Sequence, residues 1–216
     1  MSITAAFSVP SSWQVVAPGS DPEASVARAV EELFVGHDRD SAAVDKHWMR
    51  ERLTRAVAMP QGVDAEVLLF AFPRRPEAGV VLPVSATVVR AAGPPLAADD
   101  DPLKVLAVMA ARDATAHPLP VLDTLALRTH EVREGAAAFA AEVEAAPVSG
   151  EDKEQLAREA ESVPMLRVRY TIPALPGHPW HLVEFSALLV EPHPDLQELY
   201  LGLFDAFVQA MRVVEV

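Results

Sequence analysis

The sequence predicts an α+β protein with a predominantly antiparallel sheet of about five to seven strands, packed by helices and followed by a long C-terminal helix. Three observations support this fold class. Hydrophobic residues make up 50% of the 216 positions, which is enough for a packed core. In several segments apolar and polar residues alternate, as in strands with one buried face. In others, above all near the C-terminus, apolar residues recur at helical spacing.

The N-terminal part is predicted to open with a hairpin and a helix. Residues 7–10 and 13–16 form two short extended segments on either side of a Pro-Ser-Ser turn. Asp21 precedes a proline, which is typical of a helix N-cap, and the apolar spacing that follows predicts a helix over about 22–35. Gly36 then ends this helix.

A second helix is expected over about 40–58, followed by two strands. The helix is predicted to bury one apolar stripe, formed by Val44, Trp48, Leu53 and Val57. Residues 66–72 are apolar on both faces, as in a central strand. Residues 80–89 alternate and predict a long strand, in which Pro83 favours a sheet edge or a bulge.

The middle of the chain predicts a capped helix and one further strand. The carboxylates of residues 99–101 precede Pro102 and favour a helix N-terminus there. Residues 119–131 are predicted to form a single strand. Its two sides are Val121, Leu125 and Leu127 on one and Thr124, Arg128 and His130 on the other.

The C-terminal third predicts a hairpin closed by a helix. Residues 166–172 and 181–189 alternate around a turn-rich loop, whose centre we place near residues 176–177. This choice fixes a register with three cross-strand pairs, Arg169 with Glu184, Val168 with Phe185 and Tyr170 with Val183. The helix that follows is expected to cover the sheet with one stripe: Leu196, Leu199, Leu203, Phe204, Phe207 and Met211.

The length fits a single domain over residues 1–216. Residues 134–162 differ from the rest, because an alanine-rich part is followed by a strongly charged part with few apolar anchors. Both parts could be helical, but surface charge pairs stabilise such helices only weakly. We therefore expect a charged and mobile insertion at about 134–162.

Charge and composition exclude several function classes. The net charge is −13, whereas a domain that binds nucleic acid usually presents a concentrated basic surface. The absence of cysteine excludes disulfides, thiolate catalysis and cysteine-ligated metals. No secretory signal and no apolar run long enough to cross a bilayer are present, so we expect a cytoplasmic protein without membrane insertion. The preference for arginine over lysine favours a bacterial source.

Histidines raise a metal-site hypothesis. His178 and His181 are close together in a Gly-His-Pro-Trp-His segment, and His193 follows the next predicted strand. We favour a structural role, because a proline separates the first two and His181 is in phase with core residues. His37 and His47 match no standard ligand spacing. We therefore expect no metal and no cofactor.

Acidic pairs and catalytic motifs give no stronger signal. Residues 38–40 and 99–101 contain paired carboxylates that could hold a divalent cation, but helix capping explains both. The sequence contains no Gly-x-Ser-x-Gly and neither of the common glycine-rich phosphate motifs. We therefore assign no catalytic residue and favour a non-catalytic role, although scattered residues could still assemble a hydrolase site.

Four residues are candidates for binding a partner. Arg167 and Arg169 share the polar face of one predicted strand, and Arg128 and His130 share the polar side of another. The two arginines of the first strand could receive an acidic partner. For that pair we favour cross-strand pairing with Glu184, because it requires no functional assumption.

Three stretches suggest a family. They are residues 7–13, residues 168–173 and residues 180–186, the last followed by the Leu-Phe-Asp-Ala-Phe of residues 203–207. Their order resembles the Mog1/PsbP-like α/β sandwich proteins, in which a hairpin and a helix precede an antiparallel sheet that ends in a helix. The resemblance covers the ends of the chain better than its middle, and residues 134–162 depart from it.

The resemblance implies a function without catalytic residues. Members of this superfamily are binding and accessory proteins, some of them associated with secretion, so we expect a cytoplasmic adaptor or scaffold with a protein partner. The acidic surface favours a basic partner, and a homo-oligomer remains open. The alternative is a small-molecule-binding protein or hydrolase with a cleft near His178 and His181.

Overall fold

The structure is a computed structural model. It describes residues 3–6, 13–16, 21–36, 42–57, 63–71, 84–91, 101–121, 124–134, 144, 150–161, 163–173, 180–189 and 194–215. Its centre is a seven-stranded sheet in the order β2-β3-β4-β8-β7-β6-β5, with every neighbouring pair antiparallel. The strands are β2 (Trp13–Val16), β3 (Val63–Ala71), β4 (Val84–Ala91), β5 (His117–Val121), β6 (Thr124–Arg133), β7 (Met165–Ile172) and β8 (Trp180–Leu188). The α+β class and its antiparallel sheet are therefore as predicted.

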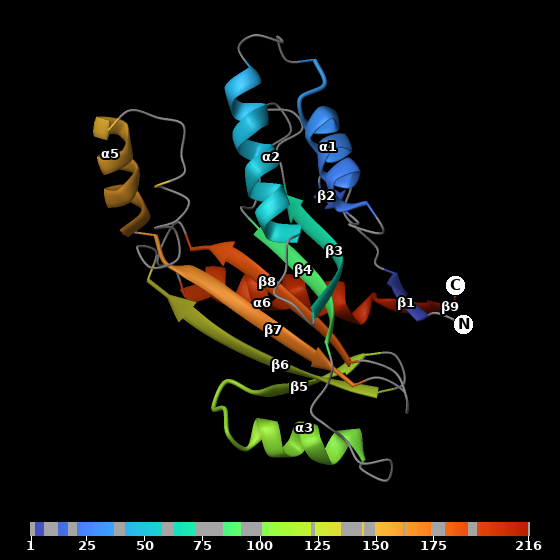
Figure 1. The fold of residues 1–216 in the computed structure, drawn as a ribbon. Coiled ribbons are helices and arrows are strands. Elements are labelled where there is room, and N and C mark those ends of the chain that lie inside the picture. Colours follow the sequence, from blue (N-terminus) through green and yellow to red (C-terminus); the bar gives the residue numbers. More distant parts are fainter. Residues whose placement is uncertain are drawn as a thin grey trace.

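Helices cover the sheet on both faces. They are α1 (Pro22–Leu33), α2 (Ala43–Val57), α3 (Pro102–Ala110), α5 (Gly150–Glu161) and α6 (Pro194–Gln209). Figure 1 shows α1 and α2 beside β2 and β3, α3 at the opposite end beside β5 and β6, and α6 along the middle strands. A second, two-stranded sheet joins β1 (Ile3–Ala6) to β9 (Arg212–Glu215). None of the helices in the described ranges is long and apolar enough to span a bilayer.

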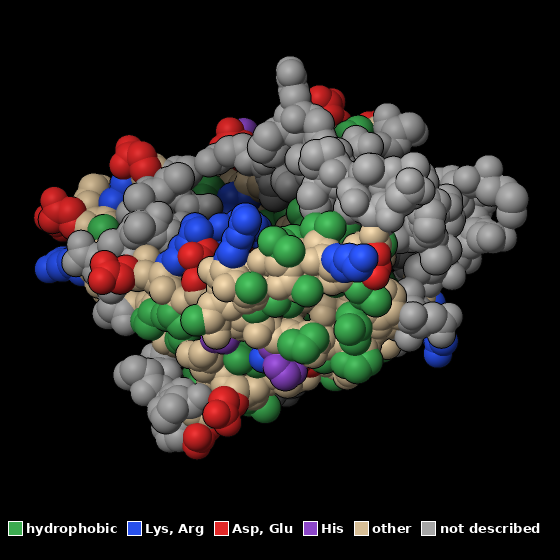
Figure 2. Space-filling view, turned by 90° about the horizontal axis from the view of Figure 1, so that it is seen from below, with side chains coloured by type: hydrophobic (Ala, Val, Ile, Leu, Met, Phe, Trp, Pro, Cys, Tyr) green, Lys and Arg blue, Asp and Glu red, His purple; other side chains and the backbone are tan. Residues whose placement is uncertain are grey.

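The surface near α3 is mixed in character. Seen from that side, apolar side chains cover much of the described surface, and basic side chains gather next to acidic ones beside them (Figure 2). Leu103 and Val108 of α3 are both exposed, and so is Leu125 of β6. Only Leu106 of this helix is buried.

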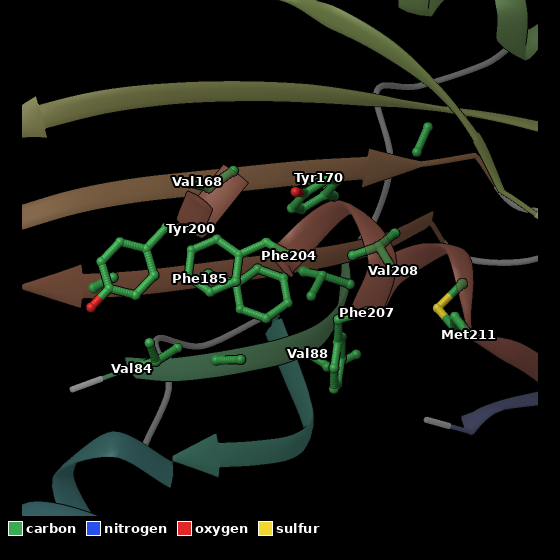
Figure 3. Close-up of a cluster of buried hydrophobic side chains, with 14 of the residues drawn as sticks. Val84, Val88, Val168, Tyr170, Phe185, Tyr200, Phe204, Phe207, Val208 and Met211 are labelled. Carbon is green, nitrogen blue, oxygen red and sulfur yellow. The ribbon is translucent and has the colours of Figure 1, made fainter. Parts of the chain in front are cut away.

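The main core lies between the sheet and α6. Phe185 of β8 is fully buried and stacks on Phe204 of α6, with ring centroids 4.3 Å apart. Trp13 stacks on Phe207 in the same way at 5.7 Å, so the helix contacts both the edge and the centre of the sheet (Figure 3). Valines and aromatic side chains from four strands complete this core: Val84, Val88, Val168, Tyr170 and Val183.

Two smaller clusters lie on the opposite face of the sheet, which we call the outer face. One joins Val16 to α1 and α2, through Val26, Val30 and Leu53 among others. The other joins Leu106 of α3 to Leu127 and Trp180. Helices therefore cover the two ends of the outer face, and the polar residues of β4, β8, β7 and β6 lie between them.

Both predicted helix caps are confirmed. The Asp21 carboxylate accepts a hydrogen bond from the Ala24 amide at 3.0 Å, and the Asp101 carboxylate accepts one from the Leu103 amide at 2.9 Å. Each satisfies an amide that the first helical turn leaves without a backbone partner. Gly36 has φ +88°, a left-handed conformation that suits glycine just after α1.

The C-terminal hairpin has the predicted register. Arg169 lies opposite Glu184, with the two neighbouring pairs also as expected. The predicted stripe of α6 was wrong at Leu199, which is 60% exposed, whereas Tyr200 and Val208 are buried. In α2 the prediction was wrong at Val44, which is 56% exposed.

The remaining differences concern strand pairing. The predicted single strand over 119–131 is a hairpin, because β5 ends at Val121 and β6 begins at Thr124 and pairs back on it. Consequently Val121 joins the main core, while Leu127 packs under α3 on the outer face. β2 pairs with β3, and residues 7–10, its expected hairpin partner, lie outside the described residues.

β4 is an internal strand, so the expectation of a sheet edge was wrong there; Pro83 itself lies outside the described residues. The described irregularity is a register shift in the neighbouring strand β3, between Ala65 and Val67. In the charged segment, α5 is described and its first turn is acidic, but most of residues 135–149 are not described.

Candidate functional site

Strand alternation assembles polar side chains on the uncovered middle of the outer face. One cross-strand row runs through Thr87, Glu184, Arg169 and Thr129, on β4, β8, β7 and β6. The next row runs through Ser85, Ser186, Arg167 and Glu131 on the same strands. Because side chains of directly paired residues point to the same face, the candidate residues Arg167 and Arg169 lie side by side with carboxylates from both neighbouring strands.

Glu184 holds both arginines. Arg169 donates from Nε and Nη2 to Glu184 Oε2 at 3.2 and 3.0 Å, and Arg167 Nη2 lies 2.5 Å from Glu184 Oε1. Arg167 Nη1 also lies 3.8 Å from Glu131 Oε1. The expected cross-strand pairing with Glu184 is therefore present, and it includes Arg167 as well as the directly opposed Arg169.

These charges border an open depression of about 240 Å³, which we call the arginine depression. It lies where β6 and β7 meet the turn after α3. Its lining residues are Asp113, Thr129, His130, Glu131, Arg133, Arg167 and Arg169. Arg133 Nη2 lies 2.6 Å from Glu131 Oε1, so each arginine of the lining has a carboxylate beside it.

Asp113 is fixed in the turn by Thr115. The Thr115 amide and hydroxyl both donate to Asp113 Oδ1, at 2.8 and 2.7 Å, and these bonds hold the pKa of the Asp113 carboxyl below its usual value. The Thr115 hydroxyl oxygen in turn accepts a hydrogen bond from the His130 amide at 3.1 Å. An ionised carboxylate is thereby held at the rim of the depression.

Arg128 lies elsewhere. Its guanidinium pairs with the Asp205 carboxylate of α6 on the core side of the sheet, and the Tyr170 hydroxyl donates to the other oxygen of Asp205 at 2.7 Å. Burial, reinforced by this hydrogen bond, raises the pKa of the Tyr170 hydroxyl far above its usual value. Of the four candidate residues, the structure therefore separates Arg128 from the depression.

His130 lies at the boundary between these two groups. It contributes to the lining of the depression, and its Nε2 atom lies 3.3 Å from Nε2 of Gln197 on α6. Burial lowers the pKa of the His130 ring, and the nearby Arg128 charge lowers it further. At neutral pH the ring therefore adds no positive charge to the depression.

The histidine hypothesis receives no assembled site. His181 is buried on β8 and does not line the arginine depression, while His178, His193 and His37 lie outside the described residues. His47 is exposed on α2, 3.7 Å from Glu51. Within the described ranges, no group of three or more His, Asp or Glu side chains is placed to hold a metal ion.

Several lining residues were not singled out from the sequence. Glu131 and Arg133 continue the alternation of β6 beyond the predicted strand end, so extending that strand by two residues would have placed them beside Arg167. The Asp-x-Thr pattern of Asp113 predicts a local turn. It gives no sign that the turn lies against β6.

No protein-family model and no curated protein matches this sequence. The Mog1/PsbP-like assignment accordingly stays a prediction, and the functional argument depends on the geometry of the arginine depression.

Proposed function

We propose that the protein is a non-catalytic binding protein and that the arginine depression receives an acidic group of a protein partner. The observation that supports this is the set of three arginines from two adjacent strands, of which Arg169 and Arg133 have side chains that are 51% and 46% exposed. Guanidinium groups recognise carboxylates through paired hydrogen bonds, and that geometry suits a partially open site.

Neighbouring carboxylates orient these arginines without using all of their donors. A guanidinium has five N–H groups, and Arg169 directs its Nε and Nη2 to Glu184. Its Nη1 group has no hydrogen bond to a side chain among the described residues, so it is a candidate donor to a carboxylate of the partner.

The local charge also supports an acidic partner, although the protein as a whole carries −13. Around the depression, Arg133, Arg167 and Arg169 are balanced by Asp113, Glu131 and the paired Glu184. Exposed charges farther away than about 8–10 Å are largely screened at physiological ionic strength. A partner's carboxylate is therefore repelled less here than over the acidic helices.

The size and lining of the depression favour this proposal over the small-molecule alternative. Ordinary ligand pockets enclose roughly 300–1,000 Å³ and are lined mainly by apolar side chains. The arginine depression is smaller, at about 240 Å³, and its lining is mostly charged. A cytoplasmic adaptor role, and membership of the Mog1/PsbP-like superfamily, are parts of the same proposal and agree with a surface that binds without chemistry.

A peptide titration tests the proposal. Fluorescein-labelled acetyl-Asp-Glu-Asp-Glu-amide and its all-lysine counterpart would be titrated with the full chain and followed by anisotropy at low salt. We expect only the acidic peptide to bind, and Arg169→Glu to weaken it by about tenfold or more. Arg28→Glu on exposed α1 is the matched control, since it makes the same change of charge far from the sheet. Equal weakening by both variants, or equal binding of both peptides, would contradict the proposal.

A further inference from the structure

β6 is longer than the strand that pairs with its outer side. β5 pairs with β6 from Val121↔Thr124 to His117↔Arg128, whereas β6 continues to Arg133. Residues 129–133 pair with β7 on the inner side. In the described part of the chain no strand pairs with their outer side, so this stretch is a sheet edge. Such an edge offers backbone donors and acceptors to an added strand.

The hydrogen bonds show which residues face this edge. In an antiparallel sheet the backbone groups of successive residues point alternately to the two neighbouring strands. The His130 amide points outward, because it donates to Thr115 Oγ1 at 3.1 Å, in the turn that precedes β5. Val132, two residues later, therefore also presents its N–H and C=O outward, while Glu131 and Arg133 bond toward β7.

The side chains along this edge alternate in character. Glu131 and Arg133 point to the outer face and line the arginine depression. Val132 points to the opposite face, in register with the buried Leu166, yet it is 49% exposed. A strand added here would place every second side chain beside the arginines and the others beside an exposed valine.

We infer that the partner docks as an extended segment with alternating acidic and apolar residues, which adds a strand to the edge of β6 at Val132. Backbone hydrogen bonds to the edge supply the pairing, and the arginine depression selects the acidic side chains. This inference rests on the proposed function, and it specifies both the partner class and the mode of binding. Charge complementarity with Arg133, Arg167 and Arg169 chooses this occupant over an arbitrary strand.

The first test uses a labelled heptapeptide with the alternating sequence Thr-Glu-Val-Glu-Val-Glu-Thr and two N-methylated versions. One version is methylated at the valines and the other at the glutamates, so each removes the donors along one side of the peptide backbone. A strand that pairs on one side should lose about tenfold or more in affinity with one version and little with the other. Equal affinities for all three peptides would overturn strand addition while leaving the acidic-group proposal intact.

The second test identifies other occupants of the edge. Amide exchange at Val132 would be measured by NMR on the full chain, free and with the heptapeptide. We expect fast exchange in the free protein and slower exchange in the complex. Strong protection in the free protein would overturn the inference: if independent of concentration, it would mean that the chain itself covers the edge, and if it grows with concentration, that a second copy does.

A variant pair completes the design. Val132→Pro removes the outward amide, whereas the bonds of β6 to β7 come from its neighbours. We expect it to abolish heptapeptide binding but not binding of acetyl-Asp-Glu-Asp-Glu-amide, with Arg28→Glu again as control. Unchanged heptapeptide affinity would contradict the inference. Should this variant fail to fold, as its melting curve would show, the methylated peptides decide alone.

Discussion

Removing the charge of Asp205 is expected to cost much more stability than removing the charge of Glu184. Asp205 pairs with Arg128, and their side chains are only 19% and 13% exposed. Asp205→Asn leaves the Arg128 cation in a mostly buried place and weakens the acceptor of the Tyr170 hydroxyl. Breaking a fully buried pair costs about 3–5 kcal/mol, so with this residual exposure we expect about 2–4 kcal/mol.

Glu184→Gln provides the matched comparison, because it also removes one carboxylate that holds an arginine. Its partner Arg169 is 51% exposed and can reach water, so we expect a cost of about 0.2–1 kcal/mol. Urea unfolding at constant pH, followed by circular dichroism, measures both losses. The double change Arg128→Met with Asp205→Asn should recover part of the larger loss. Equal losses for the two single variants, or no coupling between Arg128 and Asp205, would refute this reasoning.

Three further predictions concern the hairpin, the core and pH. Arg169→Glu should cost about 0.2–1 kcal/mol, and adding Glu184→Arg should restore part of it in a double-mutant cycle; zero coupling would mean that their hydrogen bonds add nothing. Phe185→Ala should cost about 3–5 kcal/mol, since the ring is fully buried, while Leu199→Ala, at a position 60% exposed, should stay within about 0.5 kcal/mol; similar losses would place the core elsewhere. Burial lowers the pKa of His130 below its ordinary 6.5, so its contribution to stability is present above that pH and is lost as the pH falls through the folded-state pKa; unfolding midpoints of His130→Gln should show a weaker decline on acidification than wild type, and parallel curves would contradict this.

The hairpin of β7 and β8 could be predicted in detail because two constraints coincided. Both strands alternate strictly, and the loop between them contains several turn residues. A shift by one residue would have moved Val168 and Tyr170 to the polar face, so the phase was fixed by burial. The Arg169–Glu184 pair followed directly from this register.

The division between β5 and β6 could not be read in the same way. The two residues between Val121 and Thr124 include no glycine or proline, so the alternation seemed to continue through them. Treating the hairpin as one strand placed Val121 on the wrong face. The same error hid the free edge of β6, because an edge depends on where a neighbouring strand stops.

The site depends on contacts that span long sequence separations. Asp205 meets Arg128 across 77 residues, between the terminal helix and β6. Neither residue carries a local pattern that predicts this pairing, because both also fit the exposed face of an amphipathic element. Sequence alternation identified the faces of individual strands, whereas the order of the strands determined which charged residues share a face.

The small sheet of β1 and β9 brings the two ends of the described chain together. Ile3 lies opposite Glu215, and Figure 1 shows the N and C labels side by side. Because these strands form a sheet separate from the main one, they can part while the seven-stranded sheet stays folded. A donor and acceptor dye attached at the two ends would therefore report opening of this small sheet alone, as a loss of energy transfer that precedes global unfolding.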